Sequence, residues 1–79
     1  LYPIATQFGV FLASVLSLGN PHCVLTVSDI NAPDLKIKGE CISQHPDFPQ
    51  QTNVEFMQIL SHNQIALRVY ERGTGETLA

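Results

Sequence analysis

The chain has 79 residues, enough for one small domain with a thin core, because a chain of this size buries only about 60% of its unfolded surface. Apolar residues make up 44% of the sequence and charged residues 14%, a balance typical of a globular segment rather than a disordered one. The net charge of −3, with only four Lys and Arg residues, excludes the clustered basic face of a nucleic-acid-binding protein.

An apolar run of 11 residues, Phe8–Leu18, is the one candidate for a membrane segment. A spanning helix needs roughly 20 such residues, and a signal peptide carries Lys or Arg ahead of its apolar core, so we expect neither here. The pattern fits a helical stripe as well as one face of a strand. Gly9 and Gly19 bracket the run and favour a strand between two turns.

Two cysteines, Cys23 and Cys41, are too few for the disulfide framework of a small secreted domain. We expect reduced thiols in a cytoplasmic protein, with a bridge between the two as the alternative. Cys23 lies within the short apolar strand His22–Val27, where a core position is more common than a nucleophilic one. No Cys or His pair has the spacing of a zinc site, so we expect no metal.

Residues 32–44 are predicted to form a surface helix, because three residues recur at helical spacing. These are Leu35, Gly39 and Ile42. Asn31 is a suitable N-cap, and Pro46 prevents the helix from continuing.

Two strands joined by a tight turn are predicted next, over Val54–Leu60 and Ile65–Tyr70. Asn63 suits the turn because it tolerates a left-handed backbone. The second strand alternates, and one of its faces holds Ile65, Leu67 and Val69. Glu71 continues that face if the strand persists, so that its carboxylate is desolvated and suited to acid/base chemistry. If the strand ends earlier, Glu71 is a solvated residue paired with a neighbouring arginine. A Gly-rich loop is expected after the strand in either case.

Polar residues flank these strands. Asn20-Pro21-His22 forms a Pro-fixed turn that can direct the amide of Asn20 and the imidazole of His22 toward one cleft. Asn53 begins the next strand, and Arg72 presents a planar fork of donors suited to a carboxylate. Each feature also has an ordinary explanation, because Asn-Pro turns and surface arginines are common.

Four short motifs nevertheless occur together: Gly19-Asn20-Pro21-His22, Asn53-Val54, Tyr70-Glu71-Arg72-Gly73 and Gly73-Thr74-Gly75-Glu76-Thr77-Leu78-Ala79. In their order and separations they resemble the C-terminal half of diaminopimelate epimerase, a cofactor-independent amino-acid racemase. In that family the Gly-rich stretch runs on into Cys-Gly-Ser/Thr-Gly, which holds one of two catalytic cysteines. The resemblance implies that this motif would follow residue 79 and that residues 1–79 hold neither catalytic cysteine.

The resemblance implies an α+β fold in which two similar domains each wrap a β-barrel-like sheet around a central helix. Residues 1–79 would be an incomplete C-terminal domain that lacks this helix. The inner face of its sheet would hold Val54, Phe56, Ile65, Leu67 and Val69. With the helix missing, we expect these side chains to drive self-association of the chain or to be covered by other parts of the parent protein.

The resemblance also implies roles for individual residues. His22 and Glu71 would set the protonation of the two catalytic cysteines, while Asn20, Asn53, Glu71 and Arg72 would bind the substrate diaminopimelate. No pyridoxal phosphate, metal or other cofactor would take part, and this chain alone would be inactive. The alternatives are a related proline racemase or phenazine-biosynthesis isomerase, and a small non-catalytic module that binds a carboxylate or a partner strand.

Overall fold

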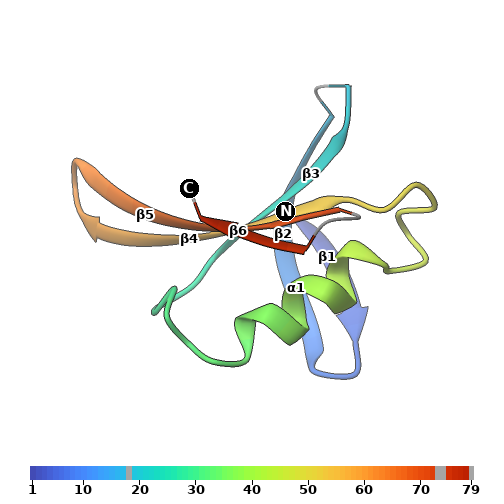
Figure 1. Ribbon diagram of the computed structural model, residues 1–79, viewed down its shortest axis with the longest axis horizontal. Helices are drawn as coiled ribbons and strands as arrows, with labels where there is room; N and C mark the ends of the chain where they lie inside the picture. Colours follow the sequence, from blue (N-terminus) through green and yellow to red (C-terminus); the bar gives the residue numbers. More distant parts are fainter. Residues whose placement is uncertain (18, 73–74, 79) are drawn as a thin grey trace.

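The computed structural model describes residues 1–17, 19–72 and 75–78 of the chain. These residues form six strands and one helix (Figure 1). In chain order they are β1 (Tyr2–Thr6), β2 (Gly9–Ser17), β3 (Pro21–Thr26), α1 (Leu35–Ser43), β4 (Asn53–Ser61), β5 (Gln64–Glu71) and β6 (Gly75–Leu78). The expected α+β class is confirmed.

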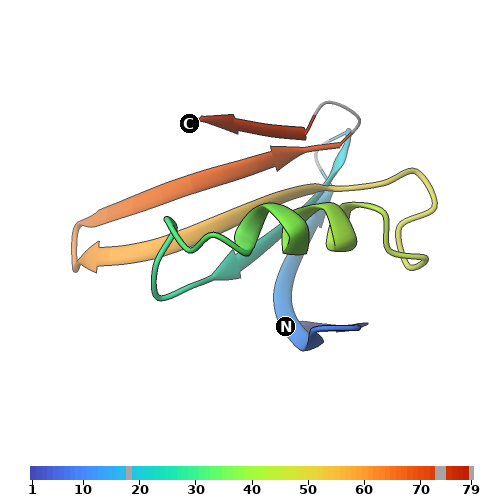
Figure 2. The ribbon, with the colours of Figure 1, turned by 60° about the horizontal axis from the view of Figure 1, so that its bottom comes forward.

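The strands form one mixed sheet whose order follows the chain, from β1 at one edge to β6 at the other. All neighbouring strands are antiparallel except β3 and β4. Parallel neighbours need a crossover connection, and α1 supplies it between these two strands. The helix lies across one face of the sheet (Figure 2). Within the described ranges no helix has both the length and the apolar character of a membrane span.

The core lies between α1 and this face of the sheet. Its buried residues come from strands β1 to β4 and the helix, and they are Ile4, Ala13, Cys23, Leu25, Leu35, Ile42, Val54 and Phe56. The helix approaches β5 closely at Gly39, where an added Cβ would lie 3.0 Å from Cβ of Tyr70. On the same side, Nη1 of Arg68 donates to the carbonyls of Ile30 and Ala32, at 2.9 and 3.2 Å, and thereby holds the segment that leads into α1.

The helix begins later than predicted, and the predicted N-cap is wrong. Asp34 occupies the N-cap position without a side-chain capping bond, while the backbone N–H of Asn31 donates to Asp29 in the preceding turn. Asp34 instead accepts from Lys38 at 2.7 Å, one turn into the helix. The helical spacing itself is confirmed, because the three residues that recur at this spacing are all buried on one side of α1.

The predicted hairpin is confirmed as β4 and β5, with a bulge between Ile59 and Ser61 at its turn. Asn63 does not adopt the left-handed backbone that it tolerates, because Gln51 alone has a positive φ among the described non-glycine residues. Two strands escaped prediction. β1 pairs with β2, and the backbone of residues 75–78 forms β6 beside β5, where only a Gly-rich loop was expected.

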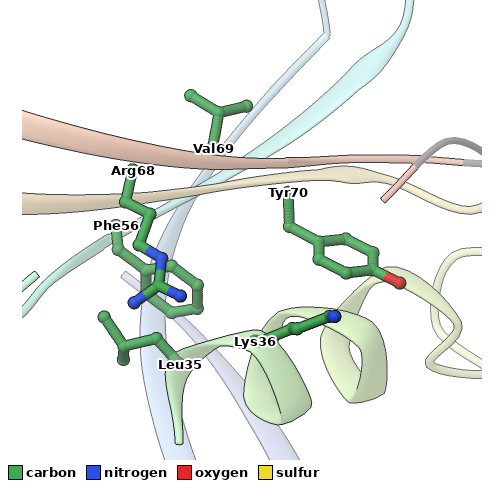
Figure 3. Close-up of a pocket in the computed structure, with 6 residues that line it drawn as sticks. All are labelled: Leu35, Lys36, Phe56, Arg68, Val69 and Tyr70. Atoms are coloured by element: carbon green, nitrogen blue, oxygen red, sulfur yellow. The ribbon is translucent and has the colours of Figure 1, made fainter. Parts of the chain in front are cut away.

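The predicted inner face of the sheet is wrong in its membership. Val54 pairs with Tyr70 and Phe56 pairs with Arg68, so these four side chains share the face that α1 covers. Figure 3 shows Phe56, Arg68 and Tyr70 on the side of α1 and Val69 pointing away from it. Cross-strand register therefore separates the two groups of apolar residues that the sequence pattern had combined.

The opposite face of β3, β4 and β5 is called the open face here, because no described element lies over it. Its apolar residues include Ile59, Ile65 and Leu67, with exposed fractions of 61%, 54% and 39%. These values exceed those of the core residues on the other face, none of which is more than 4% exposed. The open face is thus apolar yet uncovered along the length of the hairpin, and it becomes polar toward the end where β3 and β4 begin.

Candidate functional site

A cleft of about 390 Å³ lies at that polar end. Its lining comprises Asn20, His22, Asn53, Glu55, Val69, Glu71 and Arg72. The structure thus brings together all five residues that the sequence singled out, although Asn20 and Arg72 are 52 positions apart.

The strand pairing explains why these residues meet. His22 near the start of β3 pairs with Asn53 at the start of the parallel strand β4. The antiparallel strand β5 ends beside these two strand beginnings, since its Tyr70 pairs with Val54 and Glu71 lies one residue further on. The beginnings of β3 and β4 and the end of β5 therefore lie side by side and carry polar side chains.

Arg72 connects three segments around the cleft. Its Nη2 donates to Oδ1 of Asn20 at 2.7 Å, and its Nη1 donates to the carbonyl of Gln50 at 2.9 Å. Its backbone N–H donates to Oδ1 of Asn53 at 2.8 Å. All three acceptors are neutral oxygens, so these bonds hold the side chain in place without neutralising its charge. Arg72 therefore keeps its positive charge in the cleft while its position is fixed.

The turn before β4 prepares this arrangement. Gln51 adopts φ of 63°, a left-handed conformation that a residue with a Cβ rarely occupies. Its N–H donates to the carbonyl of Phe48 at 2.8 Å, and the N–H of the buried Thr52 donates to Ser43 at 3.2 Å. These bonds close the turn, direct the carbonyl of Gln50 to Arg72, and place Asn53 at the first position of the strand. Backbone strain of this kind persists where the surrounding structure enforces it.

Glu55 is the lining residue that sequence reasoning missed. Its Oε1 lies 3.1 Å from Nδ1 of His22, and the two side chains are 28% and 24% exposed. Glu55 stands on the open face between Val24 on β3 and Val69 on β5. The signal was present in the sequence, because Glu55 has the same strand parity as Met57 and Ile59, and a carboxylate is out of place in such an apolar row.

Glu71 ends β5 on the open face, as the alternation predicted, but it is exposed. The expected desolvation of its carboxylate is therefore absent from the part of the protein that the structure describes. The cleft combines two carboxylates, one guanidinium and one imidazole. Such a set can hold a ligand that carries both ammonium and carboxylate groups, as amino acids do. The residues Gly73 and Thr74 of the Gly-rich motif lie outside the described residues.

The two cysteines do not line this cleft. Both are free thiols in the structure, with no bridge between them, and their reduced state stays a prediction. Cys23 is fully buried in the core, as predicted, and burial raises the pKa of its thiol. Cys41 is partly exposed on α1, on the other side of the sheet. Residues 1–17, 19–72 and 75–78 contain no group of three or more His, Cys, Asp or Glu side chains placed to hold a metal ion.

Sequence comparison identifies the family of this chain. The family model for diaminopimelate epimerase matches residues 14–79, a range that includes every predicted site residue. The chain belongs to the diaminopimelate epimerase family. Curated members of that name are similar in sequence. The member from Pelotomaculum thermopropionicum is 47% identical over 77 residues, which cover 98% of this chain and 28% of the relative.

Two further family members extend the comparison. The diaminopimelate epimerase of Thermosynechococcus vestitus is 49% identical over 77 residues, covering 98% of this chain and 27% of the relative. That of Legionella pneumophila strain Paris is 56% identical over 64 residues, covering 81% of this chain and 23% of the relative. The chain thus spans about a quarter of the length of the curated relatives it matches.

Proposed function

We propose that residues 1–79 are part of the C-terminal domain of a diaminopimelate epimerase, an isomerase that interconverts LL- and meso-diaminopimelate. The observation that carries this proposal is the cleft in which Asn20, His22, Asn53, Glu71 and Arg72 meet, in a chain of this family. The reaction belongs to the synthesis of lysine and peptidoglycan precursors, so we assign the protein to the cytoplasm.

Diaminopimelate carries an ammonium and a carboxylate at each end, and the charges of the cleft complement one such end. In this proposal the guanidinium of Arg72 attracts the distal carboxylate, and the carboxylate of Glu71 attracts the distal ammonium. Asn20 and Asn53 contribute amide groups from either side of Arg72. A substrate without the distal carboxylate would leave Arg72 unpaired in a closed cleft, which provides selectivity.

Inversion of the α-carbon requires one group to remove the proton and another to deliver a proton to the opposite face. We assign these steps to two cysteine thiols that lie outside residues 1–79, because Cys23 is buried and Cys41 is on the far side of the sheet. His22 and Glu71 would then set the protonation of those thiols. No pyridoxal phosphate or metal takes part in this mechanism. It follows that the 79-residue chain alone is inactive.

The open face has a role in the same proposal. We propose that a central helix, supplied by the rest of the domain, packs against the open face and completes a barrel-like layer. This helix would cover the exposed side chains of Ile59, Ile65 and Leu67. The described helix α1 covers the opposite face and is a separate element.

The test is exchange of the substrate α-hydrogen in deuterated water, catalysed by the full-length protein that carries this segment. We expect deuterium at the α-carbon of LL-diaminopimelate together with formation of the meso isomer, resolved by chiral chromatography. Proline serves as the control substrate and should not exchange. Exchange of proline instead would indicate a proline racemase, and tight binding of diaminopimelate without exchange would indicate a non-catalytic module.

A further inference from the structure

The carboxylate of Glu55 on the open face contacts His22 of the cleft. A carboxylate in an apolar row of a sheet calls for an explanation. Glu55 lies in a row of β-branched neighbours, with Val24 and Val69 as its cross-strand partners. A half-buried carboxylate in such a row is costly unless a polar partner satisfies it. His22 is that partner, at 3.1 Å, and stands two residues away in register across the parallel pair of β3 and β4.

We infer that Glu55 is a positioning residue, which fixes the ring tautomer and orientation of His22 for the chemistry of the cleft. A carboxylate accepts hydrogen bonds and does not donate them, so Nδ1 of His22 carries the hydrogen in this contact. Nε2 is then the ring nitrogen left for exchange of a proton with a group in the cleft. This inference rests on the proposed function, because it assigns His22 an acid/base task.

The alternative is that Glu55 itself binds the substrate ammonium. The geometry favours the positioning role, because one oxygen of Glu55 is already engaged by His22 and the side chain is only 28% exposed. Glu71, at the mouth of the same cleft, is exposed and thus more accessible to a ligand. The two carboxylates therefore have separate tasks: Glu71 faces the ligand, and Glu55 acts through His22.

A second histidine of the chain provides an internal reference. Nε2 of His45 lies 2.7 Å from the carbonyl of Ala5, and Nδ1 of His45 accepts the backbone N–H of Asp47 at 3.1 Å. His45 must therefore carry its hydrogen on Nε2, the opposite of His22. The two tautomers give distinct ¹⁵N shifts, so one spectrum reads both rings.

The experiment uses the full-length protein labelled with ¹⁵N-histidine, with resonances assigned from His22→Gln and His45→Gln variants. We expect wild-type His22 to carry its hydrogen on Nδ1. Glu55→Val should release His22 to the other tautomer, leave His45 unchanged, and lower kcat by roughly 10- to 100-fold, with KM changed less than about threefold. Glu55→Gln keeps an oxygen acceptor for Nδ1 and should retain the tautomer and most of the rate.

Glu40→Gln is the matched control, because it removes the same charge on the exposed side of α1, and both readouts should stay at wild-type values. The inference is overturned if wild-type His22 carries its hydrogen on Nε2 alone. It is also overturned if Glu55→Val changes neither the tautomer nor the rate, or if Glu55→Gln is as slow as Glu55→Val. A rise in KM at constant kcat in both variants would assign Glu55 to substrate binding instead. If Glu55→Val does not fold, the wild-type spectrum and Glu55→Gln still decide.

The spectrum also separates this inference from the proposed function. A wild-type protein that shows the Nδ1 tautomer but exchanges no α-hydrogen would contradict the epimerase proposal. It would leave the coupling of Glu55 to His22 intact. An active wild-type protein whose His22 carries its hydrogen on Nε2 would support the epimerase proposal and contradict the inference about Glu55.

Discussion

The two faces of the sheet differ in how far the described residues cover their apolar side chains. On one face, α1 covers side chains such as Leu25 and Phe56, which are 4% and 3% exposed. On the open face, Ile59, Ile65 and Leu67 of the β4–β5 hairpin are 39% to 61% exposed, and polar residues gather at one end. Burial stabilises a large apolar side chain by about 1.5–3 kcal/mol, so the first face has a reason to be ordered that the second lacks.

This difference indicates that one face contributes mainly to stability and the other to the candidate site. The α1 face holds the strands in register, and that register brings Asn20, His22, Asn53 and Arg72 to one cleft. In our proposal, the open face carries the ligand-facing groups and receives the rest of the domain. Substitutions on the α1 face should therefore affect stability, whereas those at the polar end of the open face should affect catalysis.

The largest effect is expected from Glu71→Gln in the full-length protein. We expect kcat to fall by roughly 10²- to 10⁴-fold, the usual contribution of an acid/base group, with thermal stability unchanged because Glu71 is exposed. Steady-state epimerisation kinetics and a thermal melt measure the two quantities. Wild-type kinetics in this variant would reduce Glu71 to an ordinary surface residue.

The second prediction compares one isoleucine on each face in the full-length protein. Ile42→Ala empties a fully buried site beneath the sheet and should lower the unfolding free energy by about 2–5 kcal/mol. Ile65 is 54% exposed in this segment, yet Ile65→Ala should cost about 2 kcal/mol or more if the central helix covers it. Denaturant unfolding measures both. A loss below about 0.5 kcal/mol for Ile65→Ala would mean that the open face stays uncovered.

A smaller effect is expected from Arg72→Lys. A lysine ammonium cannot bond the oxygens of Asn20 and Gln50 in the fixed geometry of the guanidinium, so we expect KM to rise about tenfold, equivalent to roughly 1.4 kcal/mol. Arg68→Lys is the matched control on the α1 face, where Arg68 holds the segment before the helix. It should reduce stability and leave KM unchanged. Equal changes in KM for both variants would show that Arg72 has no special place in the cleft.

The smallest effect concerns the reactivity of Cys23 and Cys41, which our proposal places outside the catalytic machinery. Burial raises the pKa of Cys23, so it should resist maleimide in the native protein even as the pH rises from about 7 to about 8.5. Cys41 is partly exposed and should react steadily. Peptide mapping by mass spectrometry distinguishes the two sites. Native-state labelling of Cys23 at the rate of Cys41 would show that the core beneath the sheet opens readily.

Local patterns predicted a good part of this structure. The hairpin followed from strict alternation, and the buried face of α1 followed from helical spacing. The face shared by Val54, Phe56 and Tyr70 did not, because alternation gives parity within one strand, whereas cross-strand register decides which parities join. β1 was missed, although it forms a local hairpin with β2, because Pro3 interrupts its short strand pattern, and β6 was missed because a Gly-rich stretch indicates a loop.

The candidate site was predicted more completely than the fold. Its motifs identified Asn20, His22, Asn53, Glu71 and Arg72, and the structure places all five at one cleft. Glu55 was missed because a charged residue in a strand is ordinarily assigned to solvent. Only the register of β3 against β4 reveals that it faces His22. The hydrogen bonds from Arg72 to Asn20 and Gln50 likewise depend on turns whose geometry no local pattern specifies.

Sedimentation equilibrium of the purified 79-residue chain tests the comparison of the two faces most directly. Ile59 and Ile65 on the open face are more than half exposed, and Leu67 is 39% exposed. Full burial stabilises such a side chain by about 1.5–3 kcal/mol, so their exposure forgoes roughly half of that value at each position. Over the three residues this is about 2–5 kcal/mol, a large part of the whole stability of a small domain. We expect the isolated chain to self-associate or to fail to fold at micromolar concentration. A stable, well-folded monomer under those conditions would contradict this expectation, because the open face would then need no cover.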